Sequence, residues 1–396
     1  MIFSAALIIL FGLLTGALCQ KAKLPPLIGM LGSGILLGPY GLGWLDDSIL
    51  GISADLRKIA LILILLRAGL NLNIEDLKRA GRPAVLMSFL PATFEIAGTT
   101  LLGGPLLGMS LKEALVLGSV LGAVSPAVIV PHMLKLMDEG YGRDKAIPQM
   151  ILAGASADDI YVIVLFSCFT AFAQGQGISP LSFLRIPTSI GLGIGVGVLS
   201  GILVSRILIH VKDGSKRTLI LLCASFLLVS LDDQLQGVIG CSGLLGSMAM
   251  GLTVSRLTEK EGHETALQLG NLWKGAELFL FVLVGAAVNI RSAVTSGLRI
   301  LLLISGALLF RMAGVYLCLL KTKLNRRETW FCMFAYLPKA TVQAAIGAVP
   351  LSMGLSCGTV VLSTAVIAIL ITAPLGALLI DLTYPRWLTK TPLTIS

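Results

Sequence analysis

Apolar stretches long enough to cross a lipid bilayer recur along the whole chain, and short polar loops separate them. A spanning helix needs about 20 mostly apolar residues, whereas the strands of a membrane barrel are about ten residues long and alternate in polarity. Of the 396 residues, 56% are hydrophobic and 13% are charged, against about 25% charged in soluble domains. The sequence therefore predicts an all-α polytopic integral membrane protein.

We predict thirteen transmembrane helices from these stretches. They cover residues 2–18, 25–43, 55–72, 83–107, 112–136, 146–173, 186–210, 216–232, 236–256, 267–289, 294–320, 328–352 and 358–383. The first stretch has no basic residues ahead of it, so we interpret it as a span and not as a cleaved signal peptide.

Basic residues of the loops predict the orientation of the chain. Alternate loops hold most of the 30 Lys and Arg residues, for example around residues 78–82, 206–217 and 321–327. By the positive-inside rule these loops are cytoplasmic, so the N-terminus lies outside and the C-terminus in the cytoplasm. The net charge of +9 is spread over short loops, which indicates topology-determining charge and not nucleic-acid binding.

Asp158 and Asp159 lie side by side in the middle of the apolar stretch 146–173. An acidic residue at the centre of a spanning helix costs about 2.5–3.5 kcal/mol on the insertion scale, and such residues usually mark a functional site. We therefore predict a site that binds cations, protons or both. The other charged residues at membrane depth are Arg67, Glu95, Lys274, Glu277, Arg311 and Lys339. Lys274 and Glu277, three apart on one predicted helix, are expected to neutralise each other.

Similar segments in the two halves predict an inverted repeat. Lys58 and the pair Asn73-Ile74 of the third span match Lys274 and the pair Asn289-Ile290 of the tenth. Seven spans separate the two segments, and because this number is odd they cross the membrane in opposite directions. Spans 1–6 and 8–13 would then form the repeat, joined by span 7.

Prolines interrupt the fifth and the twelfth span at matching places in the two halves. The fifth contains Pro126 and Pro131, and the twelfth contains Pro338. Proline inside a helix removes a backbone hydrogen bond and kinks or unwinds the helix. Paired interruptions in an inverted repeat point to a transport site near the bilayer midplane, so we predict two crossing discontinuous helices in these spans.

Three motifs resemble the sodium/proton antiporters of the cation/proton antiporter superfamily. They are GAVSPAVIVP at 122–131, SADD at 156–159 and LPKATVQAAIG at 337–347, and the likeness continues to ILITAPLG at 369–376. The chain is most similar to the NHA-type exchangers of animals and their bacterial relatives. The resemblance implies a secondary active sodium (or lithium)/proton antiporter, not an enzyme, with transported ions and no cofactor. We expect it in the inner membrane of a bacterium.

The resemblance also implies a homodimer in which a core bundle moves against a fixed interface domain like an elevator. On this chain the interface domain would comprise residues 1–81 and 214–292, and the core ion-transport bundle residues 82–175 and 293–396. Residues 176–213 would form a linker helix. The expected partners are membrane lipid and a second copy of the chain.

Asp159 is the expected main ligand of the cation and the carrier of the proton. Ser156 lies three residues earlier on the same helix face, and unwound backbone at Val124 and Ser125 would add oxygen atoms, the ligands that hard cations take. Asp158 is the expected modulating partner, so we predict sodium binding at Asp158 and Asp159. A proton and a cation that compete for one carboxylate would couple the two fluxes.

Lys339, Arg311 and Glu95 are expected to compensate the charge of the site. The resemblance implies that electrogenic relatives carry a lysine where this chain has Arg311, and arginine keeps its proton at any working pH. Glu95 and Arg311 fall on repeat-related spans and are expected to form a buried ion pair. The NHA branch has a glutamate at the position of Ala287, which leaves Lys339 without that partner. We expect exchange closer to electroneutral than to electrogenic.

Several alternatives stay open. On the same fold, the chain could be a potassium/proton antiporter or a sodium-coupled symporter, and a channel is a further alternative. An intramembrane aspartyl protease needs two carboxylates face to face, whereas neighbours on a helix point about 100° apart. The seven cysteines are scattered without a CxxC or Cys/His cluster, so the sequence predicts neither a metal site nor a disulfide framework.

Overall fold

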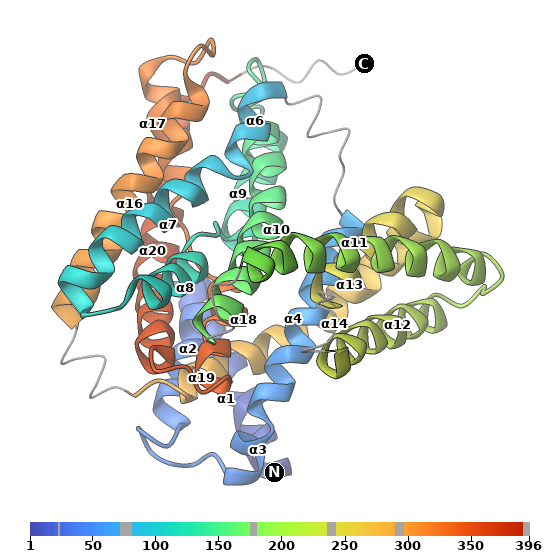
Figure 1. Cartoon of the computed structure of the whole chain (residues 1–396). Coiled ribbons are helices and arrows are strands. Elements are labelled where there is room, and N and C mark those ends of the chain that lie inside the picture. Colours follow the sequence, from blue (N-terminus) through green and yellow to red (C-terminus); the bar gives the residue numbers. More distant parts are fainter. Residues whose placement is uncertain (23, 72–80, 175–179, 236–242, 290–296, 391–396) are drawn as a thin grey trace. The chain divides into compact units, whose positions relative to one another are not determined.

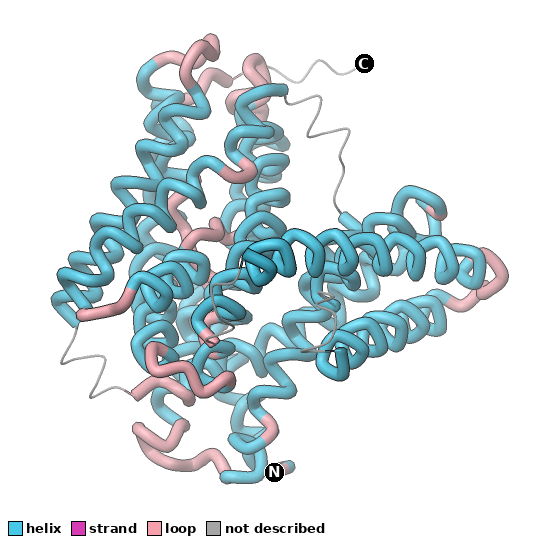
Figure 2. The backbone as a smooth tube through the Cα atoms, viewed as in Figure 1, coloured by secondary structure: helices cyan, strands magenta, loops and turns pink. Residues whose placement is uncertain are grey.

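The structure is a computed structural model that describes residues 1–22, 24–71, 81–174, 180–235, 243–289 and 297–390. Nearly all of these residues are helical, as the sequence predicts (Figure 2). Within them, the one β pairing is an isolated bridge between Tyr141 and Lys390. The described part of the chain is thus an almost purely helical protein.

The helices follow one another along the chain as labelled in Figure 1. They are α1 (Ile2–Lys21), α2 (Pro26–Leu37), α3 (Asp47–Gly51), α4 (Ser53–Asn71), α6 (Gly81–Met87), α7 (Leu90–Leu107), α8 (Leu111–Leu121), α9 (Pro126–Glu139), α10 (Ile147–Ala173), α11 (Pro180–Leu208), α12 (Gly214–Leu235), α13 (Gly243–Leu257), α14 (Glu259–Ala286), α16 (Gly297–Leu319), α17 (Arg326–Ala335), α18 (Thr341–Ile346), α19 (Val349–Ser352) and α20 (Gly358–Trp387).

By length and composition, eight helices within the described residues can cross a membrane. They include α1, the combined α6–α7, α10, α16 and α20. The other predicted spans coincide with helices that are shorter, more highly charged or interrupted, namely α2, α4, α8–α9, α13 and α17–α19. The chain is therefore an integral membrane protein.

Contacts divide the chain into two compact units. The first consists of Met1–Gly51, Asn73–Ala173 and Phe281–Ser396, and the second of Ile52–Leu72 and Gln174–Leu280. The first unit contains both aspartates and every charged residue that we expect to compensate them.

The second unit is built on α13, which packs against α4, α11 and α12. In this unit Lys274 is exposed and donates a hydrogen bond to Asn271 Oδ1 (3.3 Å). The charge that interacts with Glu277 is Arg67. The expected Lys274–Glu277 pair is therefore wrong for the described residues, because Lys274 lies on an outward face of α14.

In the first unit, α7 lies along α16, α8 packs against α7 and α10, and α17 packs against α20 (Figure 1). Helices α8 and α17 begin with the same type of N-terminal cap. Ser110 and Glu113 form a reciprocal capping box at the start of α8, and Asn325 and Glu328 form one at the start of α17. Each box satisfies two of the backbone N–H groups that have no partner inside a helix.

Both capped helices end at a non-helical segment. Helix α8 ends at Leu121 and α9 begins at Pro126, and the chain between α17 and α18 is likewise non-helical over residues 336–340 (Figure 2). The N–H of Ser125 donates to the carbonyl of Pro338 (2.8 Å). This hydrogen bond joins the two non-helical segments directly.

Helix α20 supports the second of these segments. The Thr372 hydroxyl accepts the N–H of Lys339 (2.9 Å), and a Cβ added to Gly376 would overlap the ring of Pro338. We expect Gly376→Ala to destabilise the protein by about 1–3 kcal/mol, because the tightly packed segment must move. Gly32→Ala in α2 is the matched control, since open space surrounds its Cβ position. Thermal unfolding in detergent measures both, and equal melting temperatures would contradict the packing described here.

Candidate ion-binding site

Arg311 of α16 is fully buried and connects several elements of the first unit. Its Nη1 donates to Glu95 Oε2 (2.7 Å) and to the Gly122 carbonyl, and its Nη2 donates to Asp158 Oδ2 (3.0 Å). Its Nε donates to the carbonyl of Tyr336 (2.6 Å). One planar guanidinium, which offers five N–H donors in a fixed fork, thereby holds α7, α10 and both non-helical segments together.

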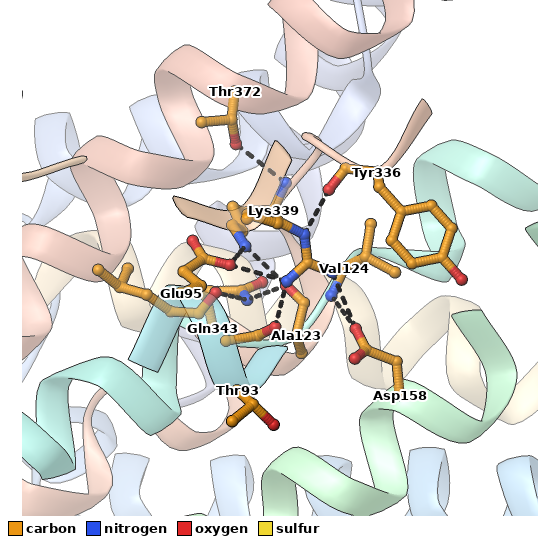
Figure 3. Close-up of polar contacts among 12 residues, drawn as sticks. Thr93, Glu95, Ala123, Val124, Asp158, Tyr336, Lys339, Gln343 and Thr372 are labelled. Carbon is orange, nitrogen blue, oxygen red and sulfur yellow. Dashed lines mark hydrogen bonds and ion pairs between the residues drawn. The ribbon is translucent and has the colours of Figure 1, made fainter. Parts of the chain in front are cut away.

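Lys339 lies in the second non-helical segment and is also buried. Its Nζ donates to Glu95 Oε2 (2.5 Å) and to the Ala123 carbonyl (3.2 Å). Gln343 donates to the same carbonyl through Nε2 (2.8 Å), and Figure 3 shows these four residues together. A single oxygen of Glu95 is thus shared by two cations, Lys339 and Arg311.

The two neighbouring aspartates of α10 have different surroundings. Asp158 has no exposed surface, and its Oδ2 accepts hydrogen bonds from Arg311 and from the N–H of Val124 (2.9 Å). Asp159 is 8% exposed. Among the described residues it forms no ion pair, and its buried Oδ1 has no hydrogen-bond partner. Asp158 is therefore charge-compensated, whereas Asp159 is not.

With every group ionised, the formal charges of this buried cluster would not sum to zero. The positive groups would be Arg311 and Lys339, and the negative groups Glu95, Asp158 and Asp159. Two positive and three negative charges leave one negative charge, and the contacts assign it to Asp159. An unpaired buried charge is strongly unfavourable. Chemically, the cluster is suited to take up one monovalent cation or one proton.

The structure brings together most of the residues predicted from the sequence. The expected Glu95–Arg311 pair is present, and Glu95 also supplies the partner of Lys339. Val124 contacts Asp158 through its N–H. Ser125 is buried, and its Oγ has no hydrogen-bond partner among the described residues. The side chain of Ser156 lies outside the part of the structure that is described.

Sequence reasoning missed several members of the cluster. Gln343 and Thr372 lie within the motifs at 337–347 and 369–376, and their polarity at membrane depth was the available signal. The carbonyls of Gly122, Ala123 and Tyr336 accept hydrogen bonds from the two cations. Backbone acceptors leave no trace in residue type, so no pattern in the sequence indicates them.

A helical membrane fold with charges buried between two helix interruptions is characteristic of a secondary ion transporter. Residues 6–382 match the transmembrane region of the sodium/hydrogen exchangers. Sodium/hydrogen exchanger 9B2 of Mus musculus is 36% identical over 381 residues, which cover 93% of this chain and 69% of that protein. Sodium/hydrogen exchanger 9B1 of Homo sapiens is 31% identical over 388 residues, which cover 93% and 73%.

Among solved structures, the sodium proton antiporter MjNhaP1 from Methanocaldococcus jannaschii at pH 8 has the same fold. The TM-score is 0.84 at 22% sequence identity, and the match covers 98% of each chain. The chain belongs to the sodium/hydrogen exchanger family, within the cation/proton antiporter superfamily. It is a transporter and not an enzyme. The resemblance drawn from the sequence motifs is thereby confirmed.

Proposed function

We propose that this chain exchanges sodium or lithium ions for protons, and that both ions compete for Asp159. The contrast within the aspartate pair carries this proposal, because Asp158 is held by Arg311 and Val124 while Asp159 has no ion pair among the described residues. A carboxylate at membrane depth without a counterion is energetically costly. Binding either a cation or a proton neutralises its charge. Since one carboxylate cannot hold both ions, each ion crosses only when the other has been released.

The remaining ligands of the cation are proposed from the oxygen atoms around Asp159. Asp158 Oδ1 and Ser125 Oγ are buried and have no hydrogen-bond partner among the described residues. Because hard cations take oxygen ligands, we assign both to the sodium site, together with the Val124 carbonyl and the Ser156 hydroxyl. The N–H of Val124 donates to Asp158, which holds this backbone segment beside the aspartate pair, and the carbonyl oxygen is the backbone atom of Val124 that can bind a cation.

The charge count supports one-for-one exchange. Arg311 and Lys339 are matched by Glu95 and Asp158, so a single charge remains to be neutralised in each loaded state. One sodium ion or one proton at Asp159 satisfies this condition equally. The cycle would then carry no net charge across the membrane.

We infer that α8–α9 and α17–α18 are the two crossing discontinuous helices of a thirteen-span inverted repeat. Both begin with a capping box and both lose helical structure about three turns later. The half-helix ends present partial charges to the site. Within this repeat, we propose that core segments 82–175 and 293–396 move like an elevator against an interface domain of residues 1–81 and 214–292, with 176–213 as the linker, in a homodimer.

The loop charges support an N-terminus outside and a C-terminus in the cytoplasm. We propose the inner membrane of a bacterium as the location. Such a transporter would use the ion gradients of that membrane directly, without a cofactor.

Cation selectivity is tested in proteoliposomes that contain the purified chain and a pH-sensitive dye. We expect sodium and lithium to collapse an imposed pH gradient and potassium to leave it unchanged. Vesicles without the protein provide the blank for leakage. A response to potassium alone would favour a potassium/proton antiporter, and sodium uptake without any pH change would favour a symporter.

Asp158→Asn is expected to retain exchange with a weaker sodium affinity. Removing this carboxylate leaves Arg311 without one charged partner, so a bound cation meets more positive charge. The loss of one charge-assisted interaction corresponds to a sodium KM raised roughly 10- to 100-fold. A titration of the exchange rate with sodium measures this. An inactive variant at saturating sodium, or an unchanged KM, would contradict the assigned roles.

A further inference from the structure

A cavity of about 460 Å³ lies where α16 and α17 meet. Lys321 and Arg326 line it, together with the aromatic rings of Tyr316 and Trp330. This cavity belongs to the first unit and contains none of the residues of the ion-binding site. The cavity is therefore separate from the ion-binding site.

The charge around the cavity is positive. Lys321 and Arg326 are exposed and form no ion pair among the described residues. The nearest acidic residue in the sequence, Glu328, is buried and held by Lys145 Nζ (2.7 Å) and by the N–H of Asn325 (2.7 Å). Its charge is already compensated, so the cavity presents two cationic side chains that suit an anion.

Lys321 has an unusual backbone conformation. Its φ is 64°, in the left-handed region that side chains other than glycine rarely adopt. The position follows the end of α16, where glycine is the usual residue. A lysine there adds a positive charge to the lining of the cavity in spite of a less favourable backbone conformation.

The lining of the cavity combines aromatic and apolar side chains with the cationic ones. Tyr316 is 50% and Trp330 42% exposed, and exposed Tyr and Trp rings are enriched where a membrane meets water. Along α16, away from the basic turn, the exposed residues Leu309 and Leu317 continue this apolar face. The cavity thus offers both cationic and apolar side chains, as an amphiphile requires.

We propose that this cavity binds an anionic phospholipid of the cytoplasmic leaflet. Lys321 and Arg326 hold the phosphate, Tyr316 and Trp330 flank the glycerol region, and the acyl chains follow the apolar face of α16. The turn between the helices is basic and lies on the cytoplasmic side in the orientation proposed above, where anionic lipids attract Lys and Arg. The bound lipid contacts the connection between α16, which carries Arg311, and α17, which leads to Lys339.

The double variant Lys321→Gln/Arg326→Gln tests the site in purified full-length protein titrated with fluorescent phosphatidylglycerol. Each Lys or Arg near a membrane surface adds to the attraction of anionic lipids. We therefore expect the double variant to bind the lipid roughly 30-fold more weakly than the unmodified protein. The matched control is Lys323→Gln/Arg327→Gln, which removes two exposed charges of the same turn that do not line the cavity. We expect the control to stay within about fivefold of the unmodified protein.

Three results would overturn the proposal. Equal weakening by both double variants would show diffuse surface attraction. Equal binding of phosphatidylcholine would show that the anionic charge is not recognised. Displacement of the labelled lipid by inorganic phosphate at matching concentrations would assign the cavity to a soluble anion.

A second measurement uses only the unmodified chain, so it does not depend on the folding of a variant. Phosphatidylglycerol with a photoreactive group on its headgroup is incorporated into vesicles with the protein and activated by light. We expect the cross-link within residues 316–333, and a cross-link confined to other segments would refute the site.

Discussion

Asp159→Asn is expected to abolish the exchange of sodium for protons. The amide matches the carboxylate in size, but it carries no charge for a cation and cannot take up a proton. The cluster then holds two positive and two negative charges before any ion binds, so a bound cation would be an uncompensated buried charge. We expect the exchange rate in proteoliposomes to fall by at least about 100-fold, at any sodium concentration.

The stability of the same variant separates a lost function from a damaged fold. Asp159 has no ion pair among the described residues, so its replacement by a neutral residue removes an unfavourable charge. We expect the melting temperature of Asp159→Asn to equal or exceed that of the unmodified protein. Asp47→Asn, at an exposed aspartate of α3, is the control and should leave both properties unchanged. Full exchange by Asp159→Asn would refute the assignment of this residue as the carrier.

Glu95→Gln is expected to produce the largest loss of stability. Glu95 Oε2 accepts from both Arg311 (2.7 Å) and Lys339 (2.5 Å), and removing one partner of a buried ion pair costs about 3–5 kcal/mol because a charge is left unpaired. Lys339→Gln should cost less, since Glu95 then still has Arg311. Chemical or thermal unfolding in detergent measures the differences.

A double-mutant cycle provides the control for this interpretation. In Glu95→Gln/Lys339→Gln the charge is removed together with its partner, so we expect this protein to be more stable than Glu95→Gln alone. The coupling between the two positions should lie within about 0.5–3 kcal/mol. Strictly additive effects would mean that the two side chains do not interact.

The sequence predicted the helical membrane class and the buried charges well, because both depend on residue type. Apolar stretches mark helices, and a carboxylate at membrane depth is conspicuous wherever it occurs. Prolines at 126 and 338 likewise marked the places where the helices are interrupted. The capping boxes at Ser110 and Asn325 were missed, although their spacing to a glutamate three residues later is a readable signal.

The pairing of the charges was harder to predict. Glu95 and Lys339 are 244 positions apart, and no spacing rule reaches across several helices. The fold alone brings them together, so the partner of Lys339 could not be named from the sequence. For Lys274 and Glu277, the short spacing in the sequence led to a wrong prediction of an ion pair. The two residues are close in sequence, but Lys274 faces outward.

The number of protons exchanged for each sodium ion tests the central claim that one uncompensated carboxylate drives the exchange. In proteoliposomes with a fixed sodium gradient, the pH gradient that stops net flux is determined at several membrane potentials. We expect this pH gradient, the null point, to equal the sodium gradient and to stay the same at every membrane potential. Each elementary charge moved gains about 2.3 kcal/mol per 100 mV, so a null point that shifts with potential would show net charge transfer and contradict one-for-one exchange at Asp159.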